Sequence, residues 1–105
     1  MTILAVITTL DTRAGAQSLS RELVERNLVA CAQISEIESC FRWDGAIQQE
    51  PEFRLVLKTV AARYAELEVA IAELHPYDVP AIYAFEAHEV FGPYAEWVTA
   101  NTQGP

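Results

Sequence analysis

The chain of 105 residues is 51% hydrophobic and 21% charged, which is ordinary for one folded domain spanning residues 1–105. Its formal net charge of −8 argues against nucleic-acid binding, because phosphates are bound by clusters of Lys and Arg that this chain lacks. No apolar run approaches the ~20 residues that span a bilayer, and no basic region precedes an apolar stretch at the N-terminus, so we expect a cytoplasmic protein.

The first residues predict a strand followed by a helix. Residues 2–9 form a continuous run of apolar and β-branched residues, typical of a strand buried on both faces at the centre of a sheet. Asp11 or Thr12 can cap the helix predicted over residues 13–27, whose apolar residues fall on one face. Asn27 is a candidate for a left-handed residue that ends this helix.

A long hairpin follows. Residues 28–43 and 47–59 predict two strands joined at Asp44-Gly45, a pair typical of two-residue hairpin turns because both positions need a positive φ. Pro51 must lie at an edge or a bulge because it cannot donate a hydrogen bond to the ladder. Strands this long overhang a domain of this size and leave aromatic residues exposed unless another subunit covers them. We therefore interpret the hairpin as an oligomerisation arm.

The rest of the chain predicts a second helix, a fourth strand and a C-terminal helix. Thr59 is a candidate cap for a helix over residues 60–74, residues 80–87 predict a fourth strand, and Gly92-Pro93 begins a short C-terminal helix. The order β-α-β-β-α-β with a C-terminal helix predicts an α+β, ferredoxin-like fold, in which two helices cover one face of an antiparallel sheet.

The segment His75-Pro76-Tyr77-Asp78-Val79-Pro80, hereafter the elbow, connects the second helix to the fourth strand. Each proline fixes its own φ and pushes the preceding residue out of the α region, so the elbow is stiff and nearly extended. It carries the densest set of polar and aromatic groups in the chain. We therefore expect it to line part of any functional site.

Several segments, in order along the chain, resemble the CutA family of divalent-ion tolerance proteins. They are Thr8-Thr9, Leu28 to Ile34, Phe41-Arg42-Trp43-Asp44-Gly45-Ala46-Ile47, Leu57-Lys58-Thr59, the elbow, and Tyr94 with Trp97. The resemblance implies a homotrimer similar in architecture to PII signalling proteins, linked to tolerance of copper and other divalent cations and without a secure enzymatic activity. The chain departs from the family pattern at Leu10, where the family has proline, at Val90 with Gly92, and at Cys40.

Cys31 and His75 are candidate metal ligands, because a thiolate suits Cu(I) and an imidazole suits Cu(II). No CxxC, HxH or HExxH spacing indicates a preformed site. Cys31 could instead be a small buried hydrophobe, and His75 could interact with the C-terminal end of the second helix. The cofactor prediction is Cu(II) or another divalent cation, with no organic cofactor, and Cys31 and Cys40 are expected to be free thiols.

A cleft between subunits is a second candidate site. Lys58, on the strand face opposite Leu55 and Leu57, could line it with Trp43, Glu50, His75 and Tyr77, as the resemblance implies. Alternatively, Trp43 and Tyr77 pack in an interface and Lys58 pairs with a carboxylate. The scattered glycines form no phosphate-binding loop, and no nucleophile motif is present, so we do not expect an enzyme.

Two functions therefore remain open at the level of the sequence. The first is a trimeric, metal-ion-binding protein of copper and divalent-cation tolerance. The alternative is a PII-like regulatory or scaffold trimer whose clefts bind a small anionic metabolite or a partner protein, in which case Lys58 and Arg42 would matter. The short chain and long hairpin favour self-association in both cases without identifying the ligand.

Overall fold

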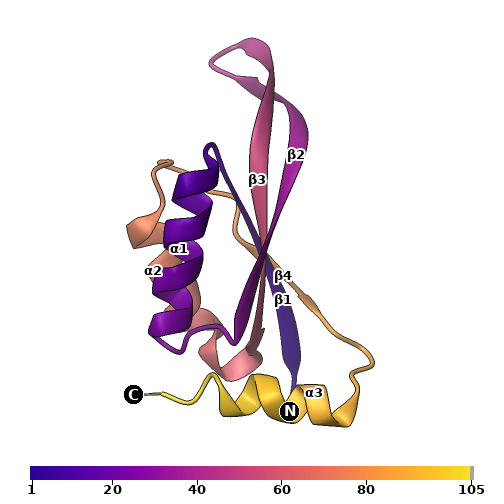
Figure 1. Ribbon diagram of the computed structural model, residues 1–105. Coiled ribbons are helices and arrows are strands. Elements are labelled where there is room, and N and C mark those ends of the chain that lie inside the picture. The colour runs from indigo at the N-terminus through magenta and orange to yellow at the C-terminus, as the bar shows by residue number, and fades with distance from the viewer. Residues whose placement is uncertain (105) are drawn as a thin grey trace.

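The computed structural model describes residues 1–104, and its elements follow the predicted order (Figure 1). They are β1 (Ile3–Leu10), α1 (Arg13–Glu25), β2 (Cys31–Trp43), β3 (Ala46–Val60), the 3-10 helix η1 (Ala61–Arg63), α2 (Tyr64–Leu74), β4 (Tyr83–Glu86) and α3 (Gly92–Ala100). The α+β prediction with a β-α-β-β-α-β order and a C-terminal helix is confirmed.

The strands form one antiparallel sheet in the order β2-β3-β1-β4. β1 pairs with β3 on one side and with β4 on the other, which confirms its predicted central position. Helices α1 and α2 lie on one face of the sheet, and α3 lies across the end of the sheet near the N-terminus (Figure 1). The edges of β2 and β4 are therefore the two free edges of the sheet in this chain.

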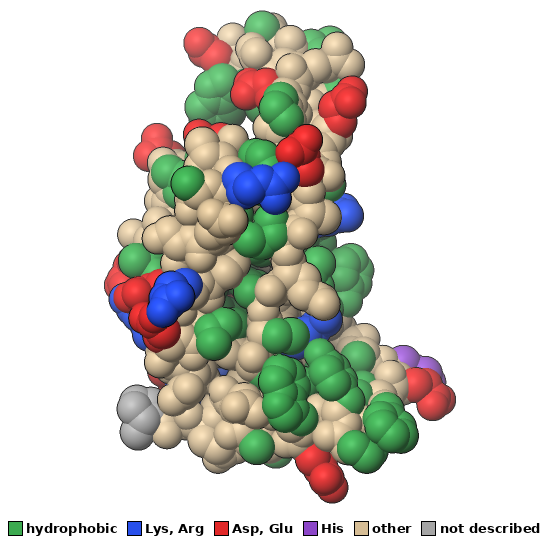
Figure 2. Space-filling view, in the orientation of Figure 1, with side chains coloured by type: hydrophobic (Ala, Val, Ile, Leu, Met, Phe, Trp, Pro, Cys, Tyr) green, Lys and Arg blue, Asp and Glu red, His purple; other side chains and the backbone are tan. Residues whose placement is uncertain are grey.

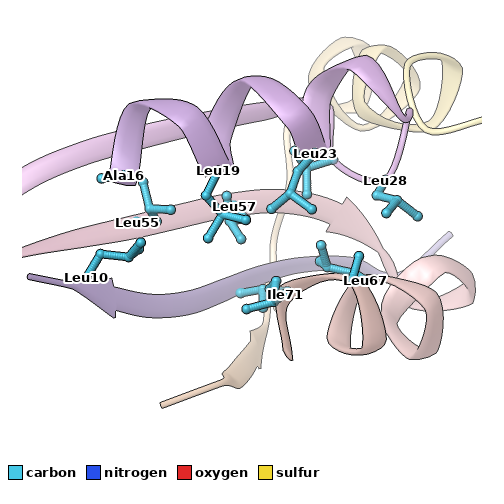
Figure 3. Packing of buried hydrophobic residues seen from close by; sticks show 12 residues of the cluster. Leu10, Ala16, Leu19, Leu23, Leu28, Leu55, Leu57, Leu67 and Ile71 are labelled. Atoms are coloured by element: carbon cyan, nitrogen blue, oxygen red, sulfur yellow. The ribbon is translucent and has the colours of Figure 1, made fainter. Parts of the chain in front are cut away.

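The main core lies between the sheet and the two long helices. Leu55 and Leu57 of β3 are fully buried and face α1 and α2, whereas Val56 and Lys58 point to the other face and are only half-buried. The alternation follows from the pleat of a strand, which sends successive side chains to opposite faces. Figure 3 shows Leu55 and Leu57 packed with Leu10, Ala16, Leu19, Leu23, Leu28, Leu67 and Ile71.

The hairpin of β2 and β3 extends past the rest of the sheet as an arm (Figure 1). β3 pairs with β2 along its whole length but with β1 only from Phe53 onward, so residues 46–52 have no β1 partner. The turn confirms the prediction, because Asp44 and Gly45 have φ values of 51° and 78°. Pro51 lies in this part of the arm, in a regular register opposite Glu38, where the side facing away from β2 is open.

Local predictions elsewhere were partly wrong. Thr12 does cap α1, since its side chain accepts a hydrogen bond from the Gly15 N–H, and Asn27 has the expected positive φ of 58°. Thr59, however, caps no helix: it lies within β3, and its buried hydroxyl donates to the Leu28 carbonyl at 2.7 Å. This contact fastens the segment before β2 to the end of β3, and the chain then turns through η1 before α2 begins.

Two predicted strands are shorter in the structure. β2 begins at Cys31 and not at residue 28, although the Ala30 N–H already donates to the Lys58 carbonyl at 2.8 Å. β4 covers only Tyr83–Glu86, because these four residues pair with β1. No helix within residues 1–104 is long and apolar enough to cross a membrane.

Candidate functional site

The elbow begins where α2 ends. The backbone N–H of His75 still donates to the Ile71 carbonyl, but its φ of −77° and ψ of 138° are extended, as expected for a residue before proline. This turn directs His75 back against the end of β1, where its side chain is buried. The end of the helix at this residue confirms the prediction made from Pro76.

The imidazole of His75 joins the elbow to β1 through both of its ring nitrogens. Nδ1 accepts a hydrogen bond from the Tyr77 N–H at 3.1 Å, and Nε2 lies 2.8 Å from the Thr9 carbonyl oxygen. Because the Tyr77 N–H can only donate, Nδ1 is the acceptor and Nε2 carries the proton that it donates to Thr9. The ring is therefore held as one neutral tautomer, and a metal ion could bind it only by displacing one of these two contacts.

Burial also favours the neutral form of His75. It lowers the pKa of the imidazole below its ordinary value of 6.5, while the hydrogen bond to Thr9 and the negative charges of Asp11 and Glu52 act in the opposite direction. In the folded protein, protonation of Nδ1 would set an N–H against the N–H of Tyr77. The elbow thus depends on an uncharged histidine.

We expect the protein to lose stability on mild acidification because of His75. The unfolded chain takes up the proton near pH 6.5, and the folded chain only at a lower pH, so the unfolded state binds more protons in between. The contribution of His75 to the free energy of unfolding is therefore present above pH 6.5 and decreases as the pH falls through the folded pKa. Urea denaturation at a series of pH values from about 7 to 5 measures this decrease.

The matched comparison uses two glutamine variants. His75→Gln removes the titrating ring, and His88→Gln removes a histidine whose side chain is 96% exposed. The wild type and His88→Gln should show the same slope of stability against pH, and His75→Gln a smaller one. Identical slopes in all three proteins would contradict a role for His75 in this pH range.

The hydroxyl of Tyr77 lies near acidic side chains. Its hydroxyl donates to Glu52 Oε2 at 2.9 Å, and its ring lies 4.7 Å from the imidazole of His75, centroid to centroid. Burial raises the pKa of the Tyr77 hydroxyl, and so do the bond to Glu52 and the negative charges of Glu52, Asp11 and Glu50. The phenol of Tyr77 therefore lies in acidic surroundings beside the buried histidine, with Glu52 as its hydrogen-bond partner.

Glu52 and Asp11 were not among the predicted site residues, although Glu50 was. Glu52 lies two positions beyond Glu50 on β3 and so on the same face of the strand, which is a signal that strand periodicity could have provided. Asp11 was considered only as a helix cap, a role that Thr12 fills. Its approach to Tyr77 depends on the path of the elbow, which no local pattern encodes.

Cys31 and Lys58 lie away from the elbow. They face each other in the register of β2 and β3, and the Cys31 Sγ is 3.7 Å from the Tyr94 hydroxyl of α3. Lys58 pairs with Ala5 on β1, four residues from the Thr9 that His75 contacts, which is about 13 Å along a strand at about 3.3 Å per residue. One chain therefore does not bring the candidate metal ligands Cys31 and His75 together.

The predicted cleft residues fall into three places. His75 and Tyr77 meet at the elbow, and the negative charge of Glu50 helps to raise the pKa of the Tyr77 hydroxyl. Trp43 lies at the tip of the arm, 64% exposed and paired with Ala46, four residues from Glu50. Lys58 donates to the Gln33 side-chain oxygen at 2.9 Å, an amide and not the carboxylate we considered. If all five line one cleft, it must be built from more than one subunit.

The described residues, 1–104, hold no preformed metal site. No group of three or more His, Cys, Asp or Glu side chains in this part of the chain lies close enough together to hold a metal ion. Both cysteines are free thiols, Cys31 half-buried and Cys40 exposed, as predicted.

Comparison with known proteins gives consistent matches. A family model described as CutA1 divalent ion tolerance protein matches residues 4–101. A probable divalent-cation tolerance protein cutA homolog of Encephalitozoon cuniculi is 43% identical over 96 residues, which cover 91% of this chain and 84% of that protein. The divalent-cation tolerance protein CutA of Thermococcus kodakarensis is 37% identical over 98 residues, which cover 93% of this chain and 94% of that protein.

Solved structures agree with these sequence matches. CutA1 from Pyrococcus horikoshii superposes with a TM-score of 0.93 at 33% identity, covering 95% of this chain and 98% of that chain. A CutA from Archaeoglobus fulgidus, described as a periplasmic divalent cation tolerance protein, has a TM-score of 0.92 at 26% identity and covers 98% of this chain and 100% of that one.

Proposed function

The chain belongs to the CutA1 divalent ion tolerance family, and from this membership we propose that it acts in divalent-cation tolerance as a homotrimer that binds divalent cations, Cu(II) among them, at its elbows. The membership favours this function over that of a PII-like regulatory scaffold. We further propose that the protein works in the cytoplasm and catalyses no reaction.

The observation that carries the cation proposal is the negative charge around the elbow, where Glu52 accepts a hydrogen bond from the Tyr77 hydroxyl and Glu50 shares its strand face. The charges of Asp11, Glu50 and Glu52 raise the pKa of that hydroxyl together with burial. Because no three ligands within residues 1–104 of one chain lie close enough to hold a metal ion, the proposed site is completed by another copy. Negative potential at that point favours a cation, and carboxylate oxygens bind hard and borderline divalent ions. Because both ring nitrogens of His75 are engaged, we assign the first contacts to the carboxylates, with His75 holding the elbow in place.

Self-association is supported by the edges and the surface of the sheet. A β2 edge that pairs with the β4 edge of the next copy makes a head-to-tail contact, and such contacts can close into a ring. Figure 2 shows apolar side chains gathered where β4 and α3 lie, and Tyr83, Phe85, Phe91 and Trp97 are exposed there. The arm adds exposed Trp43 and Ile47. The number of three copies is the prediction made from the family resemblance.

The proposal is tested by calorimetric titration of the protein with Cu(II) and with Zn(II). The double variant Glu50→Gln, Glu52→Gln should bind at least about thirtyfold more weakly, since each lost charged ligand removes on the order of 1 kcal/mol or more. The control variant Glu68→Gln, Glu73→Gln removes the same charge from α2. Its affinity should equal that of the wild type.

Two further variants distinguish the carboxylate site at the elbow from a site formed by Cys31 and His75, the ligands predicted from the sequence. Cys31→Ser should leave Cu(II) binding unchanged, and His75→Ala should weaken it only through the loosened elbow, as seen by a matching loss of stability. A loss of binding in Cys31→Ser, with full binding in the Glu50 and Glu52 double variant, would contradict a carboxylate site at the elbow.

A further inference from the structure

We draw no further inference here: the strongest candidate, the groove of about 700 Å³ between the C-terminal end of α1 and the side of α2, carries none because its two arginines, Arg26 and Arg63, are already paired with glutamates of this chain and nothing in the structure shows what covers it.

Discussion

Ala84→Pro is expected to convert the proposed homotrimer into single chains of 11.7 kDa that remain folded. β4 is an edge strand, and the Ala87 N–H donates to the Ile3 carbonyl of β1. Because the N–H groups of an antiparallel strand alternate in direction, that of Ala84 points away from β1, to the free edge. Proline at this position removes only a donor that a neighbouring copy would use.

The control for this prediction is Ala84→Val, which enlarges the side chain but keeps the N–H. Sedimentation velocity gives the mass of both variants, and far-ultraviolet circular dichroism checks that both are folded. A trimeric wild type and valine variant with a monomeric proline variant would support edge-to-edge assembly through β4. A proline variant with the mass of the wild type would rule out this edge as the interface.

Leu57→Ala is expected to cost about 2–5 kcal/mol of the free energy of unfolding, the range for leucine truncation in a close-packed core. Leu57 is fully buried on β3 and packs in the cluster formed with α1 and α2. The loss combines the transfer free energy of the removed groups with the cavity that they leave. Urea denaturation at one fixed protein concentration measures it, because assembly makes the apparent stability depend on concentration.

Val69→Ala is the matched control on the outer side of α2, where the Val69 side chain is 56% exposed. Substitutions at such positions usually change stability by less than about 0.5 kcal/mol. The loss in free energy of unfolding should therefore be several-fold larger for Leu57→Ala than for Val69→Ala. A loss below about 1 kcal/mol for Leu57→Ala would contradict its place in the core, given the range for buried leucines.

The arrangement of charge along β3 relates these predictions to function. Glu50 and Glu52 lie toward the arm, and Arg54 and Lys58 lie toward α3, all in one alternate set. In a closed ring of copies, each set would recur at the same level around the axis. One assembly would thus present a band of carboxylates, suited to cations, toward its arms.

Most of the fold can be predicted from the sequence, because the signals for its elements are local. Asp44-Gly45 predicts the hairpin turn through the positive φ that both residues adopt, and Asn27 ends α1 for the same reason. The elbow prolines determine where α2 stops. Backbone preferences and apolar periodicity depend only on near neighbours, so they can be read without knowing which segments meet.

The contacts of the site residues depend on how distant segments pack, and no local pattern predicts them. Thr59 does not cap a helix as predicted, because its hydroxyl donates to the carbonyl of Leu28, a residue distant in sequence. His75 contacts Thr9 and Tyr77, whereas Cys31 meets Tyr94 at the other end of the sheet. These partners follow from strand register and from the path of the elbow, which bring together residues that no sequence spacing relates.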